Sequence, residues 1–355
     1  MNNFLKIFFK QRILGVDIGT DSIKVAEISV WGKHKKLENY SEVKSSLVSK
    51  DPLLSVDEKG NLVSSSLISS ALREILKEAS IKTKKVVFSL PDFLTLAASF
   101  EIPPMPEKEI AGAVYYNASR YITLPISEVT LDWRIVPNNP QSKDSPMKVF
   151  LIAIPNQVIK EYQEIAKAAG LNLHALEPEV FGIVRSLAKN DKNVACLIDM
   201  GAKTSTINII DNGHLKRSYS FNFSGNQLST ALSSALGVKL EEVEKVKNEE
   251  GILSKKENVT KTLKSFIDQL FSEIKNISTD FLEEEKKQID EFYLTGGISN
   301  LPGLKDYFME NFKGPVYIPN YFSDFDHPRI LKDSLFQMSP RFSVVVGVAL
   351  VILDI

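Results

Sequence analysis

The sequence predicts an α/β protein built from two related lobes, and three observations support this fold class. An Asp-x-Gly turn between two apolar, strand-like segments occurs at Asp17 and Gly19 and again at Asp199 and Gly201. Segments with helical periodicity alternate with the strands. The length of 355 residues suits about two domains, at roughly 150 residues each. The repeated turn therefore indicates two lobes, separated by the length of chain that a bilobed cleft needs.

Composition excludes several classes of protein. Lys and Arg number 43 and Asp and Glu number 44, which gives a net charge of −1 and argues against a dominant nucleic-acid surface. The 43% hydrophobic content argues against a disordered polyanion. A lone cysteine, Cys196, excludes a disulfide framework and a Cys-rich zinc site, and the four histidines show no paired spacing.

The expected elements follow from periodicity and from Gly and Pro positions. Apolar runs predict strands, 3.6-residue periodicity predicts helices, and the prolines at 103, 104 and 106 mark a linker or a strand exit. In chain order, we expect strands at 13–18 and from 23, a helix at 65–79, a strand at 85–90, a helix at 107–120, strands at 131–136 and 149–155, a helix at 157–169, a second strand–turn–strand from 194, and a long amphipathic helix at 258–282.

The two ends of the chain carry apolar segments. No run of 18 to 20 apolar residues is present, so no transmembrane helix is expected. Residues 344–353 predict a buried helix, for which Ser339 and Pro340 resemble an N-cap and a first helical proline. The N-terminal MNNFLKIFFK is a poor secretion signal because lysines interrupt it. Its phenylalanines suit either a short membrane-surface anchor or a segment packed on the body.

The glycine turns suggest phosphate chemistry. Each turn leads into a second strand, whereas a P-loop or a dinucleotide fingerprint needs a helix there. Backbone N–H groups in such turns bind anions, and Asp17 and Asp199 would hold a hydrated Mg²⁺. Lys24 could neutralise developing negative charge. The alternative is a pair of ordinary hairpin turns, in which Asp and Gly are common. A third glycine-rich block, LTGGISNLPGL, favours the phosphate interpretation.

Three blocks resemble motifs of the actin-like ATPase superfamily. VDIGTDSIKV resembles phosphate-1, LIDMGAKTSTINII resembles phosphate-2 and LTGGISNLPGL resembles the adenosine motif, while FSVVVGVAL resembles the closing connect-2 segment. The resemblance implies an actin-like (ribonuclease H-like) bilobed fold around a nucleotide cleft, with ATP and Mg²⁺ as ligands.

Within that superfamily the chain is similar to the PilM family, the cytosolic actin-like components of type IV pilus assembly. The segment from Ile102 to Val136 resembles the inserted 1C-type subdomain, and the chain stops after connect-2, where FtsA-like proteins continue. The resemblance implies the following domains: 1–84 as the first part of lobe 1, 85–171 as the inserted subdomain, 172–195 as the return of lobe 1, 196–338 as lobe 2 and 339–355 as a helix returning to lobe 1.

The resemblance also implies roles for individual residues. Asp17 and Asp199 match the Mg²⁺-side carboxylates, and Glu179 matches a carboxylate that orients the attacking water, although Glu177 lies only two residues away. The expected nucleotide contacts are Gly19, Thr20, Asp21, Ser22 and Lys24 in the first loop, Gly201, Ala202, Lys203 and Thr204 in the second, Gly225, Asn226, Glu244 and Lys247 over the adenosine, and Gly296, Gly297 and Ile298 in the adenosine loop.

Two departures from the family pattern stand out. The chain reads Tyr121-Ile-Thr-Leu-Pro125 where the family often has a tyrosine, a hydrophobic residue and then proline, which puts the local turn in doubt. Asp21 occupies a position that is Ser in many relatives, and an extra carboxylate near phosphates would weaken nucleotide affinity or alter metal demand.

Several functions are compatible with the sequence. The first is a cytoplasmic ATP-binding scaffold, peripheral at the inner membrane, with slow or no hydrolysis. The resemblance implies that it docks the cytosolic N-terminal peptide of a PilN-like membrane protein in a groove near the 1C-type subdomain. The second is a filament-forming or division-type ATPase with self-association surfaces, or an equivalent scaffold of a related secretion system. A small-molecule phosphotransferase ranks last because no substrate-loop Asp base is evident. A pseudo-ATPase is disfavoured by the intact glycines, and no nucleic-acid partner is expected.

Overall fold

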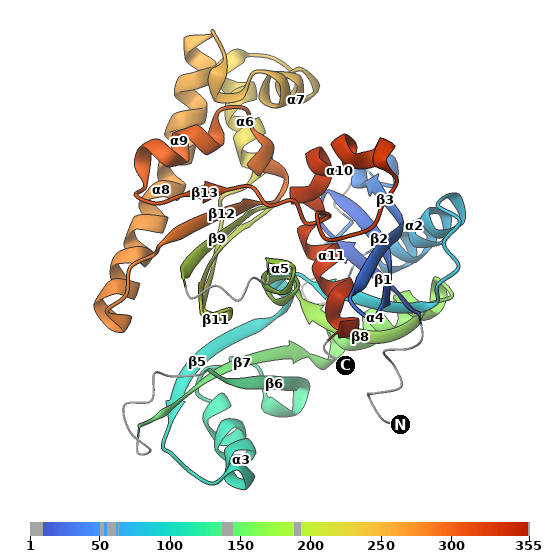
Figure 1. The fold of residues 1–355 in the computed structure, drawn as a ribbon, viewed down its shortest axis with the longest axis vertical. Helices are drawn as coiled ribbons and strands as arrows, with labels where there is room; N and C mark the ends of the chain where they lie inside the picture. Colours follow the sequence, from blue (N-terminus) through green and yellow to red (C-terminus); the bar gives the residue numbers. More distant parts are fainter. Residues whose placement is uncertain are drawn as a thin grey trace. The chain divides into compact units, whose positions relative to one another are not determined.

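The computed structural model describes residues 10–49, 53–54, 62, 64–136, 145–187 and 193–353, and the predicted N-terminal anchor lies outside these residues. The chain forms two compact units (Figure 1). The first unit comprises Met1–Arg185, His214–Arg217 and Val344–Ile355, and the second comprises Ser186–Gly213 and Ser218–Ser343.

A five-stranded sheet organises the first unit, with the order β3-β2-β1-β4-β8. Its strands are β1 (Gln11–Ile18), β2 (Ser22–Trp31), β3 (His34–Lys44), β4 (Lys85–Leu90) and β8 (Asn172–Pro178). Strands β1, β2 and β3 pair antiparallel, whereas β1, β4 and β8 run parallel. Every residue of β1 from Ile13 to Ile18 is buried, as expected for a strand covered on both faces.

Alternation along β1 assigns its two faces. Leu14 and Val16 share a core with helices α2 (Ser65–Glu78) and α4 (Asn156–Ala168). Gly15 points to the other face, where a Cβ would lie 2.9 Å from the Cβ of Ala349 in α11 (Ser343–Ala349). The predicted C-terminal helix is therefore present, and it packs directly on the central strand.

Two further glycines bring α11 against α5 (Glu179–Leu187). A Cβ on Gly347 would lie 2.8 Å from the Cα of Gly182 and closer still to the Gly182 carbonyl. Real Cβ atoms essentially never approach other heavy atoms to less than 3.0 Å. Arg185 of α5 also donates to the Gly347 carbonyl at 3.1 Å. The two helices thus meet backbone to backbone, and only glycine fits there.

The second unit repeats the strand pattern of the first. Its sheet has the order β11-β10-β9-β12-β13, formed by β9 (Val194–Met200), β10 (Ser205–Asp211), β11 (His214–Phe221), β12 (Glu291–Thr295) and β13 (Val316–Tyr317). Of β11, only the residues from Ser218 onwards are grouped with this unit. Strand β9 pairs antiparallel with β10 and parallel with β12, as β1 does with β2 and β4. The expectation of two related lobes is met strand by strand.

Helices complete the second unit. They are α6 (Gly225–Leu236), α7 (Leu240–Glu249), α8 (Glu257–Glu285), α9 (Leu304–Asn311) and α10 (Lys332–Met338). The long amphipathic helix predicted at 258–282 is α8, and its buried residues recur every three or four positions from Val259 to Phe281. Phe271 contacts the rings of Phe308 and Phe312, which fastens α8 to α9 and the segment that follows it.

A third, antiparallel sheet belongs to the first unit but has its own core. Its order is β5-β7-β6, with β5 (Leu96–Ile102), β6 (Val129–Val136) and β7 (Met147–Pro155). Helix α3 (Glu107–Ala118) contributes Ile110 and Val114 to that core. The predicted inserted region, 85–171, is wider than this substructure, because β4 pairs with β1 and α4 packs in the core of the first sheet.

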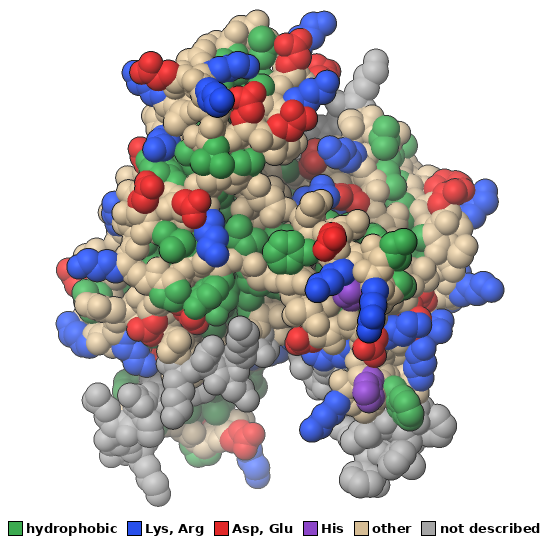
Figure 2. Space-filling model, turned by 45° about the horizontal axis from the view of Figure 1, so that its top comes forward, with side chains coloured by type: hydrophobic (Ala, Val, Ile, Leu, Met, Phe, Trp, Pro, Cys, Tyr) green, Lys and Arg blue, Asp and Glu red, His purple; other side chains and the backbone are tan. Residues whose placement is uncertain are grey.

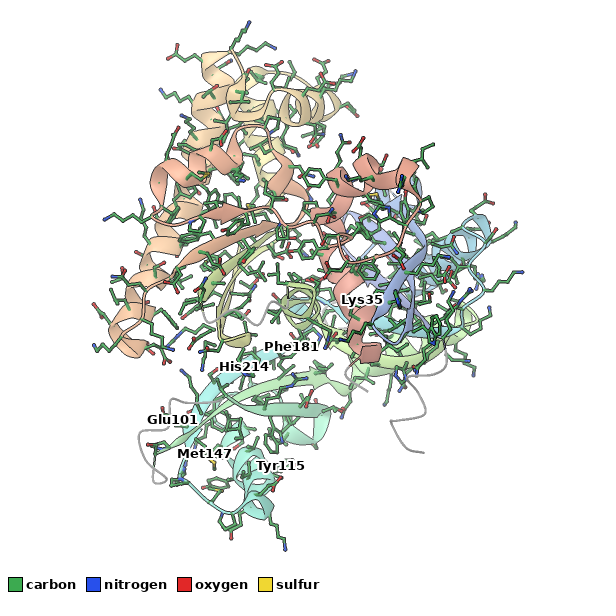
Figure 3. The ribbon with its side chains drawn as sticks, in the orientation of Figure 1. Lys35, Glu101, Tyr115, Met147, Phe181 and His214 are labelled. Atoms are coloured by element: carbon green, nitrogen blue, oxygen red, sulfur yellow. The ribbon has the colours of Figure 1, made fainter. Side chains whose placement is uncertain are left out.

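Two phenyl rings and one guanidinium group link the third sheet to α5. The Phe181 ring of α5 lies 5.9 Å from the Phe150 ring of β7, edge to face. The guanidinium of Arg134 in β6 lies 5.3 Å from the centroid of the Phe181 ring. Phe181 is labelled in Figure 3. The start of α5 is therefore held between the first sheet and the third.

Trp31 corrects one expectation. The sequence placed both tryptophans in the core or half-buried, and Trp133 in β6 is half-buried, but Trp31 is 58% exposed. Trp31 is the last residue of β2, at the hairpin turn to β3, and it is the exposed end of an otherwise largely buried strand. Position at the strand end, rather than hydrophobicity, decides its exposure.

The described residues include one helical stretch that could cross a membrane by length and composition alone, Arg329–Ile352. Of its apolar window, 72% is buried inside the protein. Such burial is typical of a core helix.

The contact between α5 and α11 predicts that Gly347→Ala destabilises the first unit by about 1–3 kcal/mol, because the added methyl group overpacks a backbone crossing. Gly112→Ala in α3 is the matched control, since a Cβ there meets nothing within 4 Å. Urea unfolding followed by circular dichroism measures both variants. Equal stability of the two would show that the crossing has room to spare.

Candidate functional site

The first hairpin loop connects β1 to β2 and carries the first set of predicted residues. Asp17 and Lys24 are cross-strand partners at its base. The loop closes through a hydrogen bond from the Gly19 N–H to the Ser22 carbonyl, 2.9 Å long. Thr20 is half-exposed and Asp21 is exposed at the tip. The turn therefore presents backbone and small polar groups above a buried charged pair.

Asp17 is the buried centre of this loop. One carboxylate oxygen accepts a hydrogen bond from Ser89 of β4 at 2.7 Å, and the other lies 3.2 Å from the Lys24 ammonium. Burial alone would lower the pKa of Lys24, but the charges of Asp17, Glu42 and Glu179 outweigh it and raise that pKa. Lys24 thus stays cationic in the interior. Ser22 donates to Glu42 at 3.1 Å, so this loop also involves a carboxylate of β3.

Because β1, β4 and β8 are parallel, carboxylates at the ends of β4 and β8 lie at the same edge of the sheet as the first hairpin loop. Leu90 and Pro178 are register partners at the ends of β4 and β8, and α5 starts immediately afterwards with Glu179. Glu179 is close enough to Lys24 and to the Tyr162 hydroxyl to act on the pKa of each. Glu177 instead makes a two-point ion pair with Arg185, at 2.5 and 2.6 Å. Of the two candidates, Glu179 acts through its charge on Lys24 and Tyr162, whereas Glu177 links β8 to α5.

Tyr162 of α4 is a neighbour that the sequence did not indicate. Its side chain is fully buried, and its hydroxyl finds no hydrogen-bond partner among the described residues. Burial raises the pKa of Tyr162 well above its usual value, and the nearby charges of Glu179, Asp17 and Glu161 add to this. The phenol therefore remains protonated beside the carboxylates.

The second hairpin loop, between β9 and β10, is braced by a helix. The Gly201 N–H donates to the Thr204 carbonyl at 3.0 Å, which closes the loop. The N–H groups of Gly225 and Asn226, at the start of α6, donate to the carbonyls of Gly201 and Ala202. Lys203 is exposed at the tip of the loop.

The glycine turn after β12 meets the same loop. Thr295 and Asp199 are register partners, and Gly296 follows with φ 82°. A Cβ on Gly296 would lie 2.6 Å from the Asp199 carboxylate, so any larger residue would push into that group. Ile298 lies beside Gly225, 3.5 Å from where a Cβ on that glycine would be. Predicted residues of the Gly201–Thr204 loop, of the start of α6 and of the Gly296 turn therefore converge within the second unit.

Helix α7 supplies the remaining predicted pair, Glu244 and Lys247, which Ser229 of α6 contacts. Lys247 lies 2.5 Å from Glu244, and both contact the Ser229 hydroxyl. Ser229 also donates to the Gly225 carbonyl at 2.9 Å, which links the pair to the start of α6. Ser229 was missed because a lone serine in a helix carries no sequence signal.

The residues fit a magnesium nucleotide better than a protein-held metal. Among the described residues, no group of three or more His, Cys, Asp or Glu could hold an ion. The two predicted magnesium-side carboxylates lie one in each unit, Asp17 beside the first loop and Asp199 beside the second. Mg²⁺ bound to a nucleotide needs few carboxylates, because phosphate oxygens and waters complete its shell.

Comparisons with known proteins agree with this fold. A family model described as Type IV pilus assembly protein PilM matches residues 15–352. The chain is similar to a solved "PilM-PilN type IV pilus biogenesis complex", with a TM-score of 0.82 and 23% identity over 95% of this chain and 97% of that chain.

More distant structures share the fold. MreB5 of Spiroplasma citri bound to AMPPNP has a TM-score of 0.52 and 14% identity, covering 95% of this chain and 94% of that chain. A MamK double helical filament has a TM-score of 0.55 and 14% identity, covering 97% and 99%. The fold is thus the actin-like one that the motifs indicated, and the chain belongs to the PilM family of type IV pilus assembly proteins.

Proposed function

We propose that this protein is an ATP-binding scaffold of type IV pilus assembly, located on the cytoplasmic side of the inner membrane. It binds ATP with Mg²⁺ and docks the cytosolic N-terminal peptide of a PilN-like membrane protein more tightly when nucleotide is bound. Hydrolysis is slow or absent. The observation that carries the nucleotide part is the convergence of Asp199, the Gly201–Thr204 loop, the start of α6 and the Gly296 turn in the second unit.

Each group has a distinct role in this proposal. Asp199 and Asp17 hold waters of the magnesium ion, and the loop N–H groups bind phosphate oxygens. Lys24, kept cationic by its carboxylate neighbours, neutralises phosphate charge. Glu244 and Lys247 contact the nucleoside, positioned by Ser229. The bound group supplies the energy of phosphoryl transfer when hydrolysis occurs, and otherwise acts as a ligand that favours one conformation.

Glu179 is proposed as the residue that orients the attacking water. It starts α5, and Phe181 in the next half-turn contacts Phe150 and Arg134 of the third sheet. A movement of Glu179 on nucleotide binding would therefore reach the third sheet through the packed Phe181 ring. If a ligand of the third sheet binds the nucleotide-bound conformation more tightly, nucleotide strengthens the binding of that ligand. The ligand then strengthens nucleotide binding by the same free energy.

The partner is proposed from two likenesses. The family is one of pilus assembly proteins, and one solved structure that the chain resembles is a complex of PilM with PilN. The alternative, a filament former, is favoured by the likeness to a MamK filament. Sedimentation with ATP separates the two functions, since only a filament pellets at micromolar protein.

The Gly296 turn predicts that Gly296→Ala weakens binding of Mg·AMPPNP by about tenfold or more, which corresponds to about 1.4 kcal/mol. The methyl group would collide with the Met200 carbonyl and with the Asp199 carboxylate, and would therefore disturb both groups beside the loop. Isothermal titration calorimetry measures the affinity, with Gly112→Ala as the control. Unchanged affinity in a folded Gly296→Ala protein would remove this turn from the site.

The two neighbouring glutamates predict opposite phenotypes. Glu177→Gln removes the negative charge that pairs with Arg185 in the protein interior and costs about 3–5 kcal/mol of stability. Glu179→Gln costs less than about 1 kcal/mol, retains Mg·AMPPNP binding and lowers ATP turnover per folded molecule. Thermal unfolding and single-turnover assays of both variants separate the roles. The assignment fails if Glu179→Gln is the destabilised variant or if turnover falls only in Glu177→Gln.

The Phe181 contacts predict that Phe181→Ala weakens the coupling between nucleotide binding and peptide binding. In the wild type, Mg·AMPPNP tightens binding of a PilN N-terminal peptide by about tenfold, within the usual range of allosteric coupling. Phe181→Ala still binds each ligand alone but reduces this enhancement to below about threefold. Fluorescence anisotropy of a labelled peptide, with and without nucleotide, measures the ratio. Full enhancement in the variant would rule out the α5 route.

A further inference from the structure

The edge of the first sheet opposite the candidate site carries a feature that the proposed function does not use. Strands β1, β4 and β8 begin at this edge, and the hairpin between β2 and β3 turns there. Gln11 pairs with Val30, and Leu14 pairs with Val86, so residues 10–12, 31–38 and 81–85 come together across neighbouring strands. We call these three segments the basic edge.

The basic edge is strongly cationic although the whole chain is nearly neutral. Its only acidic residue is Glu38. Lys33, Lys82 and Lys84 are exposed, and Lys35 is labelled in Figure 3. In the space-filling view, several Lys and Arg side chains gather at the lower right, with histidine side chains among them (Figure 2). The cationic residues of the edge are Lys10, Arg12, Lys33, Lys35, Lys36, Lys82, Lys84 and Lys85.

The single carboxylate of the edge does not balance this charge. Glu38 lies 2.5 Å from Lys10, 2.9 Å from Lys36 and 3.6 Å from Arg12. Burial acts to raise the pKa of Glu38, but hydrogen bonds from Lys10, Lys36 and Ser29 outweigh it and lower that pKa to about 2. Glu38 is therefore an anion at neutral pH and is shared among three cations. An excess of positive charge remains at the surface.

An exposed indole stands in the middle of these cations. Trp31 ends β2, and Gly32, with φ 58°, turns the chain back towards His34. The Trp31 ring lies 6.3 Å from the His34 ring, and 58% of the residue is exposed. Tryptophan is enriched where an apolar ring meets the headgroups of a bilayer. Clustered lysines bind anionic lipid headgroups.

We propose that the basic edge docks the first unit on the anionic phospholipid surface of a bilayer. The lysines contact the headgroup phosphates, and Trp31 enters the headgroup region. This inference goes beyond the proposed function, because it needs neither nucleotide nor a peptide partner. An acidic protein segment would satisfy the cations but would leave the exposed indole without a role, so the lipid surface is the better match.

Vesicle binding of the full chain tests the proposal. The protein carries two tryptophans, so Trp133→Phe leaves Trp31 as the only indole emitter. We expect this protein to bind vesicles of phosphatidylcholine with phosphatidylglycerol, with a blue shift of Trp31 emission, and to bind pure phosphatidylcholine weakly. Added salt weakens the binding because it screens charge. Lys33→Gln and Lys82→Gln each weaken it by about fivefold, and Trp31→Ser, measured by co-sedimentation, weakens it several-fold.

A second pair of exposed lysines is the charge-matched control. Lys255→Gln and Lys261→Gln each remove the same charge from the second unit and should each retain vesicle binding within twofold. Equal loss in both lysine pairs, equal binding to neutral vesicles, or an absence of the blue shift would each overturn the proposal. Tight binding to polyglutamate, insensitive to Trp31→Ser and stronger than binding to vesicles, would identify a dock for an acidic protein instead. Thermal unfolding of each variant excludes loss of fold.

Discussion

Strand direction is the constraint on which both units depend. In each five-stranded sheet, one central strand pairs antiparallel with the strand that follows it and parallel with a later one. Consequently the hairpin turn and the carboxyl ends of the parallel strands fall at one edge, where Asp17 meets Ser89 and Asp199 meets Gly296. In the first unit, the same rule sends the amino ends of the parallel strands, with their lysines, to the opposite edge.

Close backbone approach is the second recurring device. At Gly296 a missing side chain leaves room for the Asp199 carboxylate, and at Gly347 it lets two helices touch. Gly296 belongs to the candidate site and Gly347 to a helix contact, but both positions lack room for a side chain. Together with the Arg185 bridge between Glu177 and the Gly347 carbonyl, the packing fixes where α5 starts. These contacts determine the position of Glu179, so its proposed role depends on neighbouring residues that act only through packing and hydrogen bonds.

Local pattern was enough to predict the hairpins, most helices and the long α8, because turn residues and periodicity act over a few positions. It could not predict contacts between distant segments. Ser89, Tyr162 and Ser229 reach the sites only through sheet order and helix packing. The sequence could not decide between Glu177 and Glu179, because the choice depends on the ion pair that Glu177 forms with Arg185, eight residues further along the chain. The exposure of Trp31 was not predicted because hydrophobicity does not indicate that a residue lies at the exposed end of a strand. The predicted residue roles in nucleotide binding stay predictions.

Hydrogen–deuterium exchange with and without Mg·AMPPNP tests whether the glycine loops bind a magnesium nucleotide. If they do, exchange slows at residues 18–22, 201–204, 225–226 and 296–298, and does not slow when EDTA removes the metal. Protection confined to other segments, or no protection at saturating nucleotide in a folded protein, would contradict it.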